Sequence, residues 1–497
     1  VLAVCALGAA AATHAFRAVY EYGFLYPALL FLLAFWTVGL AFLALHAWFP
    51  PRPSGRGAGL AMVGSTVALA SVGHLAAERI ELVRVRMLVE HHRRALGRLL
   101  APGVTARREG AKVAGKLFPR AISTRTVPGS VAAGAPPFRS EPHVVVLALD
   151  ALRRDAVGAL GGAEGVTPAL DALAARAQVW ERAYAPGPGT GLSVGSLLTG
   201  LPPATLMATG ALPLTLPAAL RERGYVTSSS SAPIHLQLGT YPALRERDAA
   251  AIGFTEVHSP GGATVADQDE SRIAGLSARL LGAEAPRFEY VHLMGSHGPY
   301  PRAELPSAYH SAVRRADALL GRLVSTIDAT AARRPTLLCV LGDHGEGLGE
   351  HGFYAHNQAL YAEQTAVPLV CAVPGAPPAR HADPLSLFEL PRLLFAALGS
   401  RWPGPTLGAP SSFAGGLALS EHFIQDRLVW RALWTRSASL HDRLLEGRRE
   451  VFDLERDPGE LADLAFGAAA AADLVTLAAE VEALERALAR EVDALAK

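Results

Sequence analysis

Two long uncharged runs dominate the hydrophobic pattern at the start of the chain. Residues 22–51 and residues 57–77 contain no charged side chain, and each run is long enough to cross about 30 Å of hydrocarbon as a helix. Residues 1–16 form a third, slightly shorter run, which fits either one partial spanning helix or a cleaved signal peptide. The pattern predicts a transmembrane region over residues 1–80, with two clear helices and one partial helix.

The pattern changes over residues 81–141, where an amphipathic juxtamembrane helix is followed by a linker rich in Gly, Pro and Ser. Arg52 and Arg56 place the short loop between the two long runs in the cytoplasm. The basic stretch over residues 79–108 would also place the segment after the second run in the cytoplasm, and the two indications conflict because that run separates the two segments. Long domains cross membranes largely regardless of flanking charge. We therefore expect a multi-pass integral membrane protein whose following domain lies on the extracytoplasmic side.

From residue 142 onward, short apolar runs alternate with helical stretches, which is typical of a largely parallel β-sheet covered by helices. Three of the runs end in side chains of the type that bind metals or anions. They are HVVVLALD (143–150), FEYVHLMGSH (288–297) and TLLCVLGDHG (336–345). Because ligands bind outside the carboxyl ends of the strands in open α/β sheets, the sequence predicts one shared site in an α/β domain over residues 142–466.

The segment APGPGTGLSVGSLLTGLPP, residues 185–203, is a fourth element of this pattern. Its Gly and Pro residues shape a tight loop, residues 191–199 can form a short helix, and Gly200 ends that helix. Thr190 then stands at the helix N-terminus, where amide groups and the helix dipole stabilise an alkoxide or a bound anionic group. A simple helix cap is the other interpretation of a threonine in this position.

The composition argues against a nucleic-acid partner and against special roles for the cysteines. The chain has 497 residues and a formal net charge of +1, and its many arginines indicate compositional bias, so we expect no nucleic-acid partner. Cys5 lies in an apolar run, and Cys339 and Cys371 fall in strand-like runs. All three are predicted to be buried small hydrophobic residues, without a disulfide framework or a thiolate metal site.

Taken in order, these motifs resemble the sulfatase family of the alkaline phosphatase superfamily. The resemblance covers residues 142–464 and rests on VVLALDALRRDAVG, YAPGPGTGLSVGSLLTGLPP, TLPAALRERGY, YVHLMGSHGPY, LGDHGEGLGEHG, HNQALYAEQTAVPLVCAVPG and the closing motif VFDLERDPGELADL. It implies an alkaline-phosphatase-like fold, in which helices sandwich a mostly parallel sheet.

The resemblance also implies a metal-binding set and a substrate-binding set of residues. The expected metal ligands are Asp150, Thr190, Asp343 and His344. The expected substrate-binding residues are His297 and His356. One divalent ion is expected, with Zn or Mn favoured and Ca or Mg also compatible with these ligands. Such an ion makes the Thr190 hydroxyl a better nucleophile, so a phosphorus or sulfur ester would be cleaved through a covalent Thr190 intermediate.

The nucleophile segment departs from the sulfatases that carry formylglycine. Those enzymes have Cys or Ser followed by Pro and Arg, whereas Leu192 and Val194 occupy the Pro and Arg positions after Thr190, which excludes that modification. Ala151 stands where the two-acid motifs continue with Asp, and GYVTSSSSAPIHL lacks the Lys expected there. Leu293 stands where two-metal phosphodiesterases carry an Asp ligand, which favours one metal.

A threonine nucleophile resembles the branch that contains lipoteichoic acid synthases and phosphoethanolamine transferases. With the membrane segments, it predicts a membrane-anchored transferase that moves a phosphoethanolamine or phosphoglycerol head group from a phospholipid substrate. Anchoring to the lipid bilayer would raise the effective concentration of such a substrate. The alternatives are a hydrolase of sulfate or phosphate esters and an inactive membrane scaffold that retains the fold. The acceptor and the oligomeric state stay open.

Other polar residues have less specific interpretations. Glu346 is either a partner that orients His344 or a solvated acid, His292 is predicted to be a core histidine, and Asp317 is a surface or packing residue. Three arginines, interpreted as exposed with an anionic cleft as the alternative, are Arg427, Arg431 and Arg436. Residues 467–497 carry apolar residues at three- and four-residue spacing, which predicts an amphipathic helix that packs on its own domain or pairs between chains.

Overall fold

The structure is a computed structural model that describes residues 140–464 apart from short gaps, together with residues 138 and 486. The gaps are residues 211, 232–239, 242, 245–246, 299, 408–415, 425–426 and 445–446. Three predicted segments lie outside the described residues. They are the transmembrane region (1–80), nearly all of the juxtamembrane segment (81–141) and, apart from Arg486, the C-terminal helix (467–497). Within the part of the chain that is described, no helix is long and apolar enough to cross a membrane.

A nine-stranded sheet runs through the described domain in the order β10-β2-β9-β6-β1-β5-β3-β4, with β11 beside β2. Its strands are β1 (His143–Leu149), β2 (Gln178–Tyr184), β3 (Val226–Ser230), β4 (Glu256–Val257), β5 (Arg287–Leu293), β6 (Thr336–Gly342), β9 (Ala366–Ala372), β10 (Ala379–His381) and β11 (Leu385–Ser386). β1 is parallel to both neighbours, β5 and β6, whereas β9 is antiparallel to β6 and β2. The predicted mostly parallel α/β sheet is confirmed.

Alternate residues of β1 explain why this strand lies in the middle of the sheet. Val144 and Val146 belong to the apolar cluster on one face, while Val145 and Leu147 belong to the cluster on the opposite face. Successive side chains of a strand point to opposite faces, and all residues of β1 are buried. Because both faces are covered, the strand is apolar at successive positions and not only at every second one.

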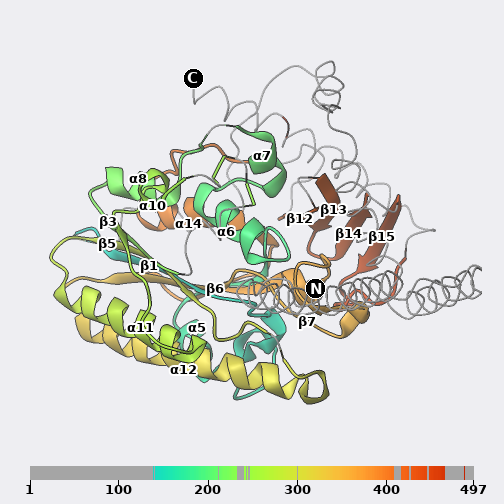
Figure 1. Cartoon of the computed structure of the whole chain (residues 1–497), viewed down its shortest axis with the longest axis horizontal. Coiled ribbons are helices and arrows are strands. Elements are labelled where there is room, and N and C mark those ends of the chain that lie inside the picture. Colours follow the sequence, from blue (N-terminus) through green and yellow to red (C-terminus); the bar gives the residue numbers. More distant parts are fainter. Residues whose placement is uncertain are drawn as a thin grey trace, which may run out of the picture. The chain divides into compact units, whose positions relative to one another are not determined.

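Helices cover both faces of this sheet (Figure 1). One face carries α5 (Pro168–Ala174), α11 (Val265–Gly282) and α12 (Ser307–Thr330). The other carries α6 (Thr190–Thr199), α8 (Leu216–Glu222), α10 (Ala249–Ile252) and α14 (Leu390–Ala397). The shorter helical segments are α7 (Pro203–Ala208), α13 (Ala362–Thr365), η2 (Arg154–Ala156), η3 (Gly158–Leu160), η4 (Arg302–Glu304), η5 (Glu350–Gly352) and η6 (Leu387–Glu389).

Helix α6 begins at the threonine that the sequence placed at a helix N-terminus. Its N-cap residue is Gly189, which is extended, and Thr190 is its first residue. The helix stops after Thr199 because Gly200 adopts a left-handed conformation, with φ of 74°, that commonly ends a helix. The short helix predicted from the Gly and Pro pattern is confirmed.

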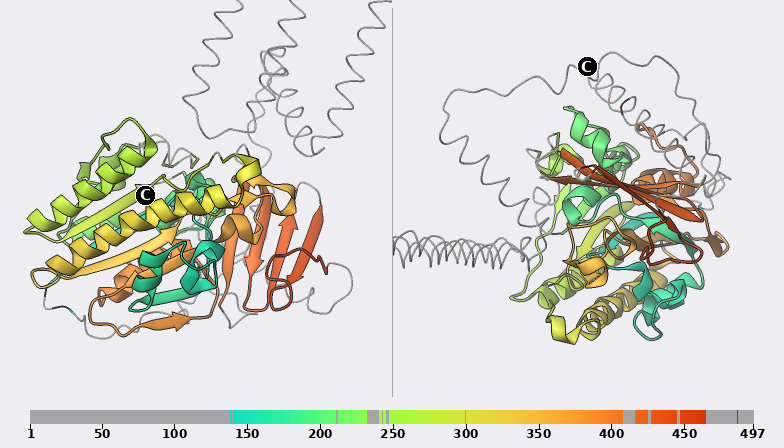
Figure 2. Two further views of the ribbon diagram at one scale, coloured as in Figure 1. Left: turned by 90° about the horizontal axis from the view of Figure 1, so that it is seen from below. Right: turned by 90° about the vertical axis from the view of Figure 1, so that its right-hand side faces the viewer.

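A second, antiparallel sheet of four strands follows in the sequence, and the apolar pattern did not predict it. Its strands, in spatial order, are β12 (Ala418–Ile424), β13 (Arg427–Trp434), β14 (Ala438–Arg443) and β15 (Arg448–Asp453). Figure 2 shows it beside one end of the large sheet. The amide of Glu421 on β12 donates to Pro186 O (2.8 Å), so this small sheet is tied to the loop before α6.

Cys339 and Cys371 correct the prediction for the cysteines. They lie directly opposite one another on the antiparallel strands β6 and β9 and form a disulfide. Both are buried, as predicted, but the expectation that they form no disulfide is wrong. The two positions are 32 residues apart, and only the pairing of the two strands brings them together. Cys5 lies outside the described residues.

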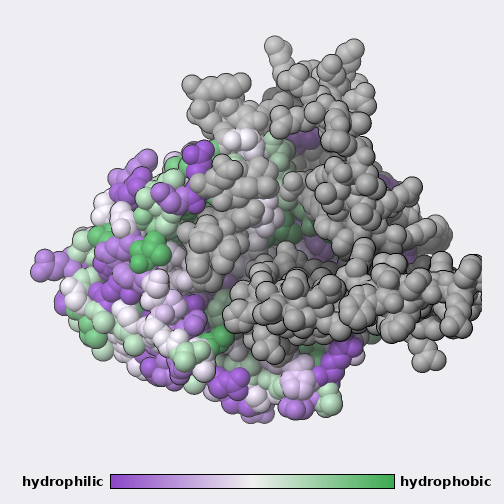
Figure 3. All heavy atoms as spheres, in the orientation of Figure 1, coloured by the Kyte–Doolittle hydropathy of each residue, from purple (hydrophilic) through white to green (hydrophobic). Residues whose placement is uncertain are grey.

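The described surface mixes polar and apolar side chains. In Figure 3, hydrophilic and hydrophobic residues are interspersed over the area that grey atoms do not cover. The exposed large hydrophobic residues are also spread along the chain, from Val257 to Leu464. Singly scattered apolar residues are normal on globular domains, so they do not point to a docking face.

Candidate active site

Three strand ends meet at one point of the large sheet. Leu149, the last residue of β1, is in register with Leu293 of β5 and Gly342 of β6. Asp150 follows β1, and its amide donates to Leu293 O (2.9 Å). The Asp-His pair of the third predicted strand follows β6 directly. Parallel strands that end at the same level therefore bring these side chains to one place, as the sequence predicted.

Asp150, Asp343 and His344 form a fully buried cluster in which one ligand atom from each side chain lies within 4.8 Å of the others. Asp343 Oδ1 accepts hydrogen bonds from the amides of Ala151 (3.3 Å) and His344 (3.0 Å). His344 Nδ1 donates to Gly345 O (2.8 Å). This bond leaves Nε2 unprotonated in the neutral ring, 3.5 Å from Asp150 Oδ1 and 3.6 Å from Asp343 Oδ2.

A divalent metal ion fits this cluster. Asp150 Oδ1 and Asp343 Oδ2 are buried without a hydrogen-bond partner among the described residues, which is costly for a carboxylate oxygen unless a cation lies beside it. Two carboxylates and one imidazole are donors that suit Zn or Mn. The hydrogen bond from His344 Nδ1 to a backbone carbonyl is also typical of a histidine that binds metal through its other nitrogen.

The hydroxyl of Thr190 joins this cluster. Its Oγ1 lies 3.3 Å from Asp150 Oδ2 and 3.1 Å from His344 Nε2. Because Thr190 is the first residue of α6, the free amide groups and the positive end of the helix dipole lie at the same place. These groups can stabilise an anionic group that is bound to the threonine oxygen.

Glycines flank the Asp-His pair because neighbouring backbone leaves no room for a side chain. A Cβ atom on Gly342 would lie 2.2 Å from Leu152 O, and a Cβ atom on Gly345 would lie 2.2 Å from Glu363 O. The amide of Gly345 also donates to Gln364 O (2.9 Å). The two glycines thus allow the pair to pack against two backbone segments, which fixes its position.

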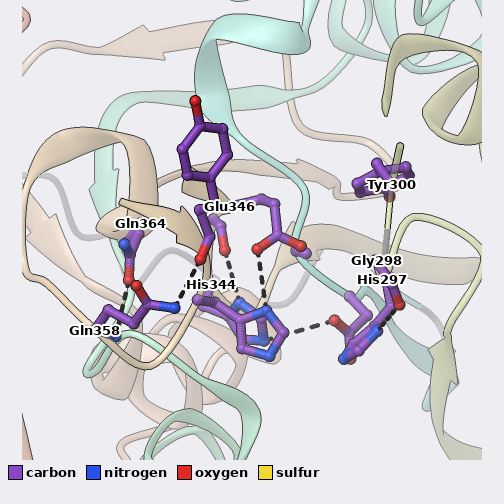
Figure 4. Close-up of polar contacts among 12 residues, drawn as sticks. His297, Gly298, Tyr300, His344, Glu346, Gln358 and Gln364 are labelled. Carbon is purple, nitrogen blue, oxygen red and sulfur yellow. Dashed lines mark hydrogen bonds and ion pairs between the residues drawn. The ribbon is translucent and has the colours of Figure 1, made fainter. Parts of the chain in front are cut away.

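His297 and His356 lie beside His344, as expected. The ring centroids of His344 and His356 are 4.4 Å apart, and those of His297 and His356 are 4.9 Å apart. Figure 4 shows His297 and Gly298 on one side of His344. His297 Nδ1 donates to Gly298 O (2.5 Å), which leaves its Nε2 available for a substrate. The structure therefore brings together all six site residues predicted from the sequence.

Glu346 contacts His356 and not His344. Its Oε1 lies 3.2 Å from His356 Nδ1, and its carboxylate is buried. Both interpretations made from the sequence, a solvated acid and a partner of His344, are wrong. The reason is a hairpin of two short strands, β7 (Gly347–Leu348) and β8 (Tyr354–Ala355), which returns residue 356 to residue 346.

His292 is a site residue that the sequence analysis assigned to the core. It is fully buried on β5, as expected, but its Nε2 lies 3.4 Å from Asp150 Oδ2 and 3.5 Å from Asp343 Oδ2. The strand register pairs His292 with Ala148, two residues before Asp150. Its position near the end of β5 is the signal that would have identified His292 as a site residue. From this position it can donate to either carboxylate or join the metal ligands.

The carboxylates and imidazoles of the site shift one another's pKa values. Burial alone would raise the pKa of Asp150, but the neighbouring imidazoles, above all His297, lower it well below its usual value. Burial lowers the pKa of His356, but the Glu346 carboxylate outweighs this effect and raises the pKa to about 9. At neutral pH the site thus holds the ionised Asp150 carboxylate, which suits a cation, beside the charged His356 imidazole, which suits an anion.

Arg153 connects the segment after β1 with the loop after β6. Its buried guanidinium donates through Nη1 to Glu346 O (2.9 Å) and to Glu350 Oε1 (2.8 Å). Its Nε and Nη2 donate to the two carboxylate oxygens of Asp155 (2.8 and 2.6 Å). This contact fixes the two ligand-bearing segments relative to each other, and the sequence pattern gave no indication of it.

The chain after His356 is tied to the loop before α6. The amide of Asn357 donates to Pro188 O (2.7 Å). Its carboxamide packs on Gly189, where a Cβ atom would lie 1.9 Å from Asn357 Oδ1. Gly189 directly precedes Thr190, so these contacts set the distance between the expected nucleophile and His356.

The remaining predicted polar residues have structural contacts. Arg431 is neither exposed nor part of a cleft, because it is buried and donates to Glu421 Oε1 (2.9 and 2.8 Å). Arg427 and Arg436 are exposed, as predicted. Asp317 is buried and accepts two amide hydrogen bonds at the start of α5 (2.8 and 2.9 Å), which confirms a packing role.

The sequence and the fold also match known proteins. The family model described as Sulfatase matches residues 142–400. The chain is 34% identical to human iduronate 2-sulfatase over 82 residues, or 16% of this chain and 15% of that protein. It is 31% identical to the phosphoethanolamine transferase EptA of Helicobacter pylori over 91 residues, or 14% of this chain and 17% of that protein. The matches thus span a small part of these relatives.

Among solved structures, the phosphonate monoester hydrolase of Agrobacterium radiobacter has a similar fold. The TM-score is 0.54 at 18% sequence identity, and the match covers 70% of this chain and 96% of that chain. At this identity the similarity concerns the fold alone. It agrees with the mixed α/β sheet and its covering helices described above.

Proposed function

The chain belongs to the sulfatase family, and we propose that it is a metal-dependent enzyme that cleaves a phosphate or sulfate ester through Thr190. The observation that carries this proposal is the position of Thr190 Oγ1, 3.1 Å from His344 Nε2 and 3.3 Å from Asp150 Oδ2. A hydroxyl is a weak nucleophile at neutral pH, and a divalent ion bound by these residues would favour its alkoxide form.

Each residue of the site then has a part in the reaction. His297 and His356 bind the anionic oxygens of the ester, and the first turn of α6 adds amide donors. The Thr190 oxygen gives up its proton and attacks phosphorus or sulfur in line; its bond to that centre forms as the bond to the leaving oxygen breaks, and the leaving oxygen takes up one proton, which balances the one lost by Thr190. Water or an acceptor alcohol then attacks the same centre and releases Thr190.

We also propose that the group transferred is a phospho-head group of the phosphoethanolamine or phosphoglycerol type, taken from a phospholipid. A threonine in place of Cys or Ser supports this proposal, as does the match to part of a phosphoethanolamine transferase. The uncharged runs at residues 22–51 and 57–77 would anchor the enzyme beside its lipid substrate. The alternative is a hydrolase of sulfate or phosphate esters, which the match to part of iduronate 2-sulfatase supports equally.

An extracytoplasmic location of the domain is part of the proposal. The buried disulfide between Cys339 and Cys371 supports it, because structural disulfides persist mainly in oxidising compartments outside the cytoplasm. The same location would give the enzyme access to the outer lipid surface and to glycan acceptors.

The proposal is tested with the full chain in detergent micelles. It is incubated with fluorescent phosphatidylethanolamine or phosphatidylglycerol, with and without a glycan acceptor, and with p-nitrophenyl phosphate and p-nitrophenyl sulfate. Head-group transfer to the glycan supports the transferase, whereas release of free product without acceptor supports the hydrolase. Equal turnover by Thr190→Ala, or no turnover of any probe, would contradict the proposed function.

A further inference from the structure

His351 lies in the hairpin loop between Glu346 and His356, but it is not one of the residues that face the metal cluster. Its Nδ1 is 3.0 Å from Glu363 Oε1, and its Nε2 is 2.8 Å from the backbone oxygen of Glu460. Its ring also stacks on Tyr361, with ring centroids 3.7 Å apart. Three contacts from two parts of the chain, residues 361–363 and residue 460, therefore hold this one imidazole.

Both ring nitrogens of His351 face acceptors, so the ring donates through both only when it is doubly protonated. Burial lowers the pKa of His351, but the Glu363 carboxylate and the oxygens of Glu460 outweigh burial and raise it. The backbone of His351 is left-handed, with φ of 50°, a conformation that few residues other than Gly and Asn adopt at low cost. The loop is thus held in a shape that needs an outside anchor.

Glu460 is that anchor, and its own side chain is held by four donors. Its Oε1 accepts hydrogen bonds from Trp434 Nε1 (3.0 Å), Ser439 Oγ (2.5 Å) and His441 Nε2 (3.0 Å). Its Oε2 accepts the amide of Ala362 (2.8 Å). The carboxylate is buried, and these donors join the segment after β15 to the four-stranded sheet and to α13.

From this geometry we infer that Glu460 and His351 are positioning residues for the site. The Glu460 carboxylate fixes the segment after β15, the Glu460 carbonyl fixes His351, and His351 fixes the loop that carries Glu346 and His356. Arg153 holds the same loop through Glu350, the residue directly before His351. Glu460 is then required for an ordered site, although it lies beyond the matched region at residues 142–400.

The catalytic consequence rests on the proposed function, but the order of the loop can be measured without it. Hydrogen–deuterium exchange by mass spectrometry on the full chain reports the amides of residues 347–355 directly. His351→Asn keeps a residue that tolerates the left-handed backbone and removes the contact with Glu363 and Glu460. We expect exchange in this loop to become about 10-fold faster or more, since the variant loses the ring contacts with both Glu363 and Glu460.

A matched control is available in the same C-terminal segment. Asp463 accepts the amide of Val451 (3.1 Å) and pairs with Arg448 (3.1 Å). Asp463→Asn therefore perturbs the segment at a different contact and is expected to leave the loop's exchange unchanged. Glu460→Ala should loosen the loop as His351→Asn does. If Glu460→Ala does not fold, because the four donors to the Glu460 carboxylate are left buried without an acceptor, the His351→Asn variant alone tests the inference.

Activity supplies the second readout. With whichever p-nitrophenyl ester the wild-type enzyme cleaves, His351→Asn is expected to lower kcat/KM by about 10-fold or more while the bound metal stays at the wild-type amount. Glu460→Ala combined with His351→Asn should lose little more than either alone, because the two act through one contact. Unchanged exchange of residues 347–355 in His351→Asn would overturn the inference. If no ester is cleaved, the proposed function fails, and the exchange result still decides whether His351 holds the loop.

Discussion

Thr190 Oγ1 lies 3.1 Å from His344 Nε2, across 154 residues of sequence. His344 Nδ1 donates to Gly345 O, so in the neutral ring Nε2 has no proton and its lone pair can bind a metal ion beside the threonine oxygen, whose proton is donated to Asp150 Oδ2. His344, which follows β6, thus lies against Thr190, the first residue of α6. This contact is the physical link between the metal-binding residues and the proposed nucleophile.

Asp343→Asn should reduce metal binding without a change of side-chain shape. It leaves the amide hydrogen bonds to Oδ1 in place but removes the charge of a buried oxygen, Oδ2, that has no hydrogen-bond partner among the described residues. We expect the metal affinity to fall by at least about 100-fold, measured as metal content by mass spectrometry after dialysis. Asp383→Asn, at an exposed ion pair with Arg436, serves as the control. Equal metal content in both variants would rule out Asp343 as a ligand.

Glu346→Ala should impair substrate binding through His356. Loss of the carboxylate leaves His356 Nδ1 without its 3.2 Å partner, so the imidazole loses its fixed orientation. We expect kcat/KM to fall by about 10- to 100-fold and inorganic phosphate to bind more weakly as an inhibitor. Glu346→Gln keeps an acceptor oxygen and should lose less. A Glu346→Ala variant with full metal content and wild-type kinetics would contradict this role.

The stabilising contribution of His351 should depend on pH. Burial lowers the pKa of His351, but Glu363 and Glu460 outweigh burial, so the folded-state pKa is raised. A raised pKa means that the folded state binds the proton more tightly, and this contribution is complete below the unfolded value of about 6.5 and is lost as pH rises through the folded value. The free energy of unfolding should therefore differ more between wild type and His351→Asn at about pH 6 than at about pH 9. A pH-independent difference would show that the ring is not charged.

Removal of the disulfide should destabilise the domain and leave the metal site intact. Cys339 lies on the buried strand β6, which ends at Gly342 directly before Asp343. The double variant Cys339→Ala with Cys371→Ala should lower the free energy of unfolding by about 2–4 kcal/mol, measured by denaturant unfolding, with unchanged metal content. Alkylation of the unfolded wild type without reductant should label neither cysteine, and labelling of both would show that the bond is absent.

Local patterns in the sequence predicted the parts of the site that depend on single elements. Asp150 and the Asp343–His344 pair each follow an apolar run that forms a buried parallel strand, and parallel strands end at a shared edge. The position of Thr190 could be predicted because the Gly and Pro residues around α6 leave one short helix with a defined start. These features needed no knowledge of how distant segments pair.

Residues that depend on pairing between segments could not be predicted in this way. His292 looked like a core residue because its neighbours in the strand are apolar, and only the register with β1 places it beside Asp150. Glu346 meets His356 because a hairpin of two-residue strands reverses the chain, a signal too short to detect from periodicity. Cys339 and Cys371 meet through one antiparallel strand in a mostly parallel sheet.

The central claim is that Thr190 is the nucleophile, and mass spectrometry of the trapped intermediate tests it most directly. The full chain is exposed briefly to the phospho- and sulfo-esters named above, quenched in acid, and analysed intact and after digestion. The structure predicts an adduct on Thr190, because the other hydroxyls of α6, those of Ser193, Ser196 and Thr199, are buried, and Ser193 donates to Gly187 O (3.2 Å). An adduct on Ser193 or Ser196, or turnover by Thr190→Ala at the wild-type rate, would contradict it.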